Sequence, residues 1–61
     1  MKAVEGYIDR ARYKYEGDRL LLDTWYAMLH YIHKCFPGAQ RIVWSCREEK
    51  WRYVVFAEID P

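Results

Sequence analysis

Residues 18–36 read DRLLLDTWYAMLHYIHKCF, and this stretch decides the fold because its apolar residues recur every three or four positions. That spacing places them along one side of a helix. Asp18 is a suitable N-cap, and Pro37-Gly38 ends the helix. At about 1.5 Å per residue, such a helix would be roughly 28 Å long. The predicted core stripe contains Leu21, Trp25, Met28, Leu29, Ile32, Cys35 and Phe36.

The residues that follow Gly38 predict a β-hairpin. Residues 41–46 and 51–59 form its expected strands, and residues 47–50 form the turn. Because the turn lacks an Asn-Gly pair, we expect a loop built around a type I turn. Symmetric pairing would place three pairs on one face, namely Cys46 with Trp51, Trp44 with Tyr53, and Ile42 with Val55. The opposite, outer face would carry Arg41, Val43, Ser45, Arg52, Val54, Phe56 and Glu58.

Residues 3–15 predict a long first strand, because they are rich in Tyr and alternate between polar and apolar residues from Asp9 onward. Gly6 is a candidate for a β-bulge. The alternation would direct three cations to the outer face of the sheet: Arg10, Arg12 and Lys14. A helix over residues 4–15 is the alternative interpretation.

The order strand, helix, strand, strand predicts one α+β domain of β-α-β-β form that spans residues 1–61. The last strand contains the apolar run of residues 54–57, so we expect it at the centre of the sheet. The prediction is therefore a three-stranded antiparallel sheet of order 1-3-2, with one helix packed across one face.

Composition restricts the class of function. Ten Lys/Arg against nine Asp/Glu give a net charge of +1, which provides no global field toward nucleic acid or an anionic membrane. We expect a cytoplasmic protein with reduced thiols at Cys35 and Cys46, because no signal peptide or membrane-length apolar run is visible. The eleven aromatic residues exceed what so small a core can bury. Four of them are assigned to the core: Trp25, Trp44, Trp51 and Tyr53.

Catalytic and metal signatures are weak. His30 and His33 have a helical metal-ligand spacing, but no carboxylate on the helix completes the set. A thiol–histidine pair lacks a third orienting group, and the three glycines are too far apart for a phosphate-binding loop. We therefore predict no catalytic residue, cofactor or metal, and a protein that is not an enzyme.

Protein interaction is the leading hypothesis. Small single-domain chains without a catalytic set are common among phage and mobile-element proteins that bind and block a host protein complex, so we expect a larger protein or complex as partner. Self-pairing into a homodimer is also expected to stabilise the domain. Arginines and rings are favoured at interfaces. The predicted contact residues are Arg12, Arg41, Arg52 and Phe56 on the outer face and Tyr26 on the helix.

Two alternatives to this contact surface remain, namely nucleic-acid binding by the outer face and strand addition at a sheet edge. Cations beside a ring on an open sheet resemble surfaces that hold single-stranded nucleic acid, so the alternative function is nucleic-acid binding. Residues 41–46 would form a sheet edge whose apolar centre could accept another strand. The candidate nucleic-acid residues are Arg10, Arg12, Lys14 and Arg52.

Overall fold

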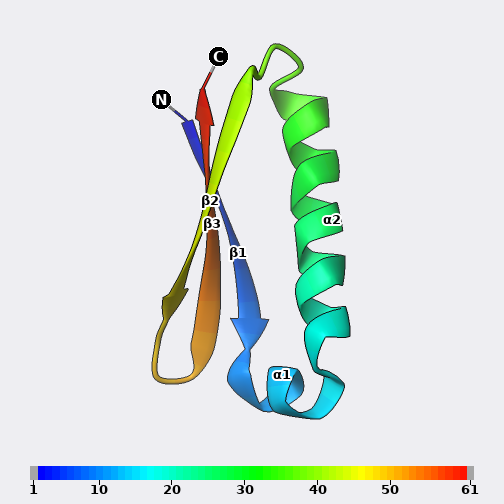
Figure 1. Cartoon of the computed structure of the whole chain (residues 1–61), viewed down its shortest axis with the longest axis vertical. Helices are drawn as coiled ribbons and strands as arrows, with labels where there is room; N and C mark the ends of the chain where they lie inside the picture. Colours follow the sequence, from blue (N-terminus) through cyan, green and yellow to red (C-terminus); the bar gives the residue numbers. More distant parts are fainter. Residues whose placement is uncertain (1, 61) are drawn as a thin grey trace.

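The computed structural model describes residues 2–60 and shows one sheet with a long helix beside it (Figure 1). The elements are β1 (Lys2–Asp9), α1 (Arg10–Glu16), α2 (Asp18–Cys35), β2 (Arg41–Glu48) and β3 (Arg52–Asp60). The strands are antiparallel in the order β1-β3-β2, which confirms the predicted class, strand order and central position of the last strand. A second helix makes the arrangement β-α-α-β-β.

The predicted strand over residues 3–15 is wrong beyond Asp9. The Asp9 carboxylate accepts hydrogen bonds from the backbone N–H groups of Ala11 at 2.8 Å and Arg12 at 3.1 Å, and it thereby caps α1. Gly17, with φ of +71°, separates α1 from α2, so Gly17 stands at the N-cap position predicted for Asp18. The helical alternative is therefore correct for residues 10–15. This correction removes three cations from the outer sheet face: Arg10, Arg12 and Lys14.

The hairpin is tighter than predicted. The Glu49 N–H donates to the Arg52 carbonyl at 2.9 Å, which leaves only Lys50 and Trp51 in the loop. The predicted register is consequently wrong, and Trp44 pairs with Ala57. The faces of the strands are unchanged, because the register differs by an even number of residues.

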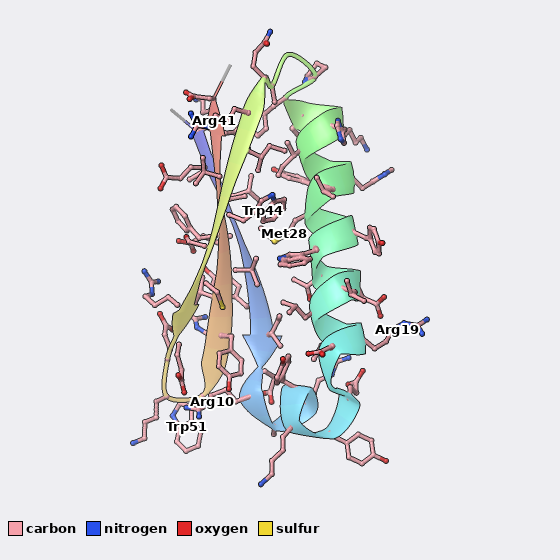
Figure 2. All side chains as sticks on the ribbon, in the orientation of Figure 1. Arg10, Arg19, Met28, Arg41, Trp44 and Trp51 are labelled. Atoms are coloured by element: carbon pink, nitrogen blue, oxygen red, sulfur yellow. The ribbon has the colours of Figure 1, made fainter. Side chains whose placement is uncertain are left out.

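The hydrophobic core lies between α2 and the inner face of the sheet, where Figure 2 shows Met28 and Trp44 in the space between them. The buried side of α2 is rotated from the predicted stripe. Trp25 stays 39% exposed, and Trp51, at the hairpin tip, is 75% exposed and outside the core. The core cluster comprises Ile8, Leu20, Met28, Ile32, Val55, Ala57 and Ile59.

Gly6 explains the position of α2 over the sheet. It pairs regularly with Val55, so the predicted bulge is absent. A Cβ atom at this position would lie 3.2 Å from the Thr24 methyl carbon. The lack of a side chain thus lets α2 approach β1 closely. The helix packs mainly against β1, and the inner side of β2 is left partly open.

Candidate functional site

An apolar groove runs between α2 and the uncovered side of β2. Its main hollow has a volume of about 370 Å³, and an adjoining hollow of about 280 Å³ shares its two tryptophans. None of the lining residues is charged. We call it the α2–β2 groove; it is lined by Leu21, Leu22, Trp25, Tyr26, Leu29, Trp44, Ser45, Cys46 and Val55.

Three aromatic rings line the groove. The Trp25 and Trp44 rings pack with centroids 6.2 Å apart and an interplanar angle of 52°. Tyr26 is 67% exposed beside them. Trp25 was predicted to lie in the core. It reaches the surface because the absence of a side chain at Gly6 lets α2 lie close to β1. The groove therefore presents aromatic area that the fold itself does not bury.

The floor of the groove is also a free sheet edge. Within residues 2–60, β2 pairs with β3 alone. In an antiparallel ladder, residues that exchange hydrogen bonds with one neighbour alternate with residues whose N–H and C=O groups point away. The bond from Glu49 to Arg52 shows that the odd-numbered residues bond to β3. The outward-pointing backbone groups thus belong to Ile42, Trp44, Cys46 and Glu48.

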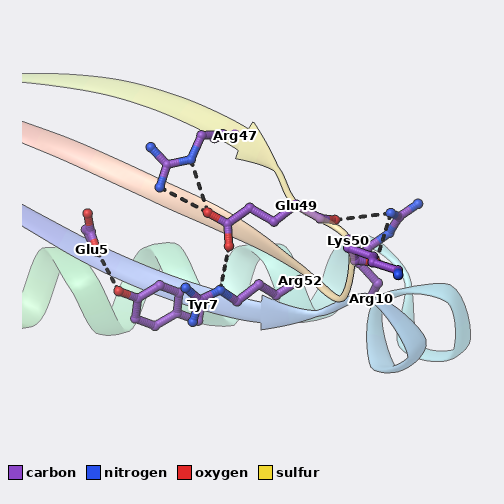
Figure 3. A network of polar contacts seen from close by, with 7 residues as sticks. All are labelled: Glu5, Tyr7, Arg10, Arg47, Glu49, Lys50 and Arg52. Atoms are coloured by element: carbon purple, nitrogen blue, oxygen red, sulfur yellow. Dashed lines mark hydrogen bonds and ion pairs between the residues drawn. The ribbon is translucent and has the colours of Figure 1, made fainter.

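The outer face of the sheet carries a network of polar contacts (Figure 3). The Arg52 guanidinium donates to the Glu49 carboxylate at 2.8 Å and lies 4.2 Å from the centre of the Tyr7 ring. Arg47 approaches the same carboxylate at 3.1 Å, and the Tyr7 hydroxyl donates to Glu5. The hydrogen bond from Arg52, followed by Arg47, lowers the pKa of Glu49. Two arginines of this face are therefore already engaged within the protein.

Long side chains cover the apolar centre of the outer face. Val54 is 0% exposed although it lies opposite the core. Its partners in the neighbouring strands are Tyr7 and Arg47, whose side chains lie on the same face. Phe56 is half-buried two residues further along β3. The outer face is therefore a solvated surface on which long side chains cover the apolar residues, and it is not an open apolar surface.

A second hollow lies at the hairpin tip and has a volume of about 520 Å³. Arg10 connects α1 to the tip: its guanidinium lies 3.1 Å from the Glu48 carboxylate and donates to the carbonyls of Glu49 and Lys50. Arg10 also lies 5.4 Å from the centre of the Tyr53 ring. The residues that line this hollow are Arg10, Ala11, Tyr13, Lys14, Lys50, Trp51 and Tyr53.

The predicted contact residues do not form one surface. Arg12 lies on α1 and is bound to Glu16 at 2.8 Å. Arg41 begins β2, and its register places it on the outer face with Arg52 and Phe56. Tyr26 alone belongs to the α2–β2 groove. The sequence did not predict the position of Tyr7 on the outer face, where it contacts Arg52, nor the exposure of Trp25 beside Trp44.

The histidines and cysteines form no recognisable centre. His30 and His33 lie on exposed positions of α2, and Cys35 and Cys46 are free and exposed. Over the described range, 2–60, no three His, Cys, Asp or Glu side chains gather as metal ligands would. In the same range, neither helix combines the length and hydropathy that a bilayer crossing requires. The inward position predicted for Cys46 is correct for its face, but the side chain is exposed at the strand edge.

Comparisons of the chain with models of protein families, with curated proteins and with solved structures found no match.

Proposed function

We propose that this protein is a small non-catalytic interaction module that binds another protein through the α2–β2 groove. The observation that carries the proposal is the position of two exposed rings, Trp25 and Tyr26, and the half-buried ring of Trp44 beside a strand edge that has no partner within residues 2–60. A bound strand would add to β2 through its outward backbone groups, and its side chains would enter the groove. Trp25, Tyr26 and Trp44 would act as the desolvated anchors.

The large exposed surface of the chain supports the proposal that it binds a partner. The radius of gyration is 12.1 Å, whereas a compact chain of this length has about 10.5 Å. The accessible surface is 4856 Å², which exceeds the value of about 4250 Å² that a folded monomer of this mass exposes. The isolated chain thus leaves roughly 600 Å² more surface in water than folding alone would leave.

The outer face is less suited to this role than the groove. Arg52 is held by Glu49 and Tyr7, and a partner carboxylate would have to compete with these contacts. Contact through Arg12, Arg41, Arg52 and Phe56 stays a prediction, as does the blocking of a host complex by a phage or mobile-element protein.

Affinity capture from the native host tests the proposal. We expect Trp44→Ser and Tyr26→Ser to reduce capture of the partner at least tenfold, because each removes an anchor ring. Tyr15→Ser, which removes a ring that is 92% exposed on α1, is the matched control and should leave capture unchanged. Circular dichroism must show the wild-type spectrum for all three variants. Full capture by both ring variants would contradict the groove as the contact surface.

Nucleic-acid binding is the second candidate, and the hairpin-tip hollow is the observation that favours it. Arg10 and Lys14 meet Lys50 there, beside the exposed ring of Trp51. Cations around an exposed ring are typical of sites for single-stranded nucleic acid. Labelled single-stranded RNA and DNA should then bind at low salt and dissociate as salt increases, and Trp51→Ala should weaken binding. Absence of binding at low salt would exclude this candidate.

A further inference from the structure

We propose that the partner at the β2 side of the α2–β2 groove is a second copy of this chain, paired edge to edge through β2. This inference rests on the interaction function proposed above and names the partner at the same site. Two copies related by a two-fold axis would extend the three-stranded sheet across the edge and bring their grooves together on one face. The pairing would use the outward backbone groups of Ile42, Trp44 and Cys46.

The two-fold axis restricts the register of this pairing. The two-fold axis is perpendicular to the sheet, and directly paired residues share a face of the sheet, so an even-numbered residue of β2 cannot pair with an odd-numbered residue of the second copy. The axis must therefore pass between one residue of β2 and the same residue of the second copy. Centring on Trp44 would set Arg41 opposite Arg47 of the second copy, and like charges in direct opposition destabilise a sheet. Centring on Ser45 sets Arg41 opposite Glu49 of the second copy. Of these two registers, charge favours the one centred on Ser45.

The selected register is complementary in charge at both ends, because the two-fold axis generates the Arg41–Glu49 pair twice. Arg41 and Glu49 both lie on the outer face, as the alternation of β2 requires. Among the residues from 2 to 60, no carboxylate lies within ion-pair distance of Arg41. The second copy would supply the Glu49 carboxylate at the end of its own hairpin, where Arg41 would join the contacts that this carboxylate already makes with Arg52 at 2.8 Å and Arg47 at 3.1 Å. The net charge of +1 opposes association very little.

The extended surface of the chain is compatible with a symmetric dimer. A stable interface buries about 800 Å² on each partner. The isolated chain exposes roughly 600 Å² more surface than a compact monomer of its mass, so it has surface in excess that a partner can cover. Pairing would cover the edge of β2 and bring Trp44 of both copies toward the joined grooves. The same contact would cover an apolar strand edge that could otherwise pair with other chains and cause aggregation.

Disulfide trapping tests the register. In a background of Cys35→Ser and Cys46→Ser, Ser45→Cys would place two thiols on Cα atoms about 4.5 Å apart, which a disulfide can bridge. The matched control is Val43→Cys on the same strand and face, whose two copies would lie about 14 Å apart. We expect the Ser45→Cys protein to cross-link under mild oxidation at least about tenfold faster than the control. Equal rates, or no cross-link in either protein, would overturn the proposed pairing.

Light scattering on the unmodified chain tests association independently. At about 100 µM we expect a mass near twice 7.5 kDa, and Arg41→Glu should shift the protein to the monomer mass. Arg41→Lys keeps the charge and should stay dimeric, and Arg19→Glu on the exposed side of α2 is the control for net charge. A monomer at all concentrations would overturn self-pairing. Partner capture that still depends on Trp44 in such a monomer would leave the interaction function standing.

Discussion

Gly6 of β1 lies directly beneath Met28 of α2, so that a Cβ atom at position 6 would stand 2.7 Å from the Met28 sulfur. This contact fixes α2 against the β1 side of the sheet. Its consequence appears on the other side, where Trp44 is left at the floor of an open groove. The groove therefore depends on the absence of one side chain in a different strand.

Gly6→Ala should destabilise the fold by about 1–3 kcal/mol, because the added methyl group overlaps Met28 and crowds Thr24. Chemical denaturation followed by tryptophan fluorescence measures this change. Gly38→Ala is the matched control: its Cβ would meet no atom within 4 Å, so its stability should be unchanged or slightly greater. An unaltered denaturation midpoint in the Gly6→Ala variant would show that α2 does not rest on β1 as described.

Arg10→Ala should reduce stability by about 1–2 kcal/mol, because Arg10 ties α1 to the hairpin tip through Glu48 and two backbone carbonyls. Arg19→Ala serves as the comparison, since the Arg19–Asp23 pair is exposed and spans 3.6 Å. We expect thermal unfolding to separate the two variants clearly. Similar midpoints for both would argue against a structural role of Arg10 at the tip.

Acidification should weaken the outer-face network. The pKa of Glu49 is lowered in the folded protein, chiefly by its hydrogen bond with Arg52. Its contribution to stability is therefore complete above the unfolded pKa of about 4.3 and is lost as the pH falls through the lower folded value. Thermal midpoints recorded between about pH 5 and pH 2 should decrease less in Glu49→Gln than in the wild type. Parallel curves for the two proteins would contradict this linkage.

Trp51→Ala should change stability by less than about 0.5 kcal/mol, because its ring lies exposed at the hairpin tip. Ile59→Ala removes a residue that is 2% exposed and should cost about 2–5 kcal/mol. The pair of variants tests the hairpin register by urea denaturation. A large loss in Trp51→Ala would instead favour the register in which Trp51 faces the core.

The distribution of apolar residues along the chain was sufficient to predict the strand order of the sheet. The run of residues 54–57 identified the central strand, and this placement fixed the order β1-β3-β2. The faces of β2 and β3 were also predicted correctly, because an even shift of register preserves them. The register itself was not, since Glu49 closes a two-residue loop that carries no Asn or Gly.

Local pattern misled the interpretation of residues 10–16. Alternating cations and rings imitate a strand, yet the capping side chain of Asp9 and the glycine at position 17 bound a short helix. The groove could not be predicted because it depends on packing: the sequence placed Trp25 on the apolar stripe of α2 but could not reveal that Gly6 would shift the helix. Tyr26 was identified as a contact residue because it lay beside that stripe.

The central strand of this sheet is also the last element along the chain. β1 and β2 do not pair with each other, and each relies on β3 for its ladder. The pairing of Lys2 with Ile59 joins positions that are almost the full chain apart. Such distant contacts pay a large loop-closure entropy before they contribute any stability, which slows folding. During synthesis, the helices can form early, but the sheet must wait until residues 52–60 have emerged to lie between its two outer strands.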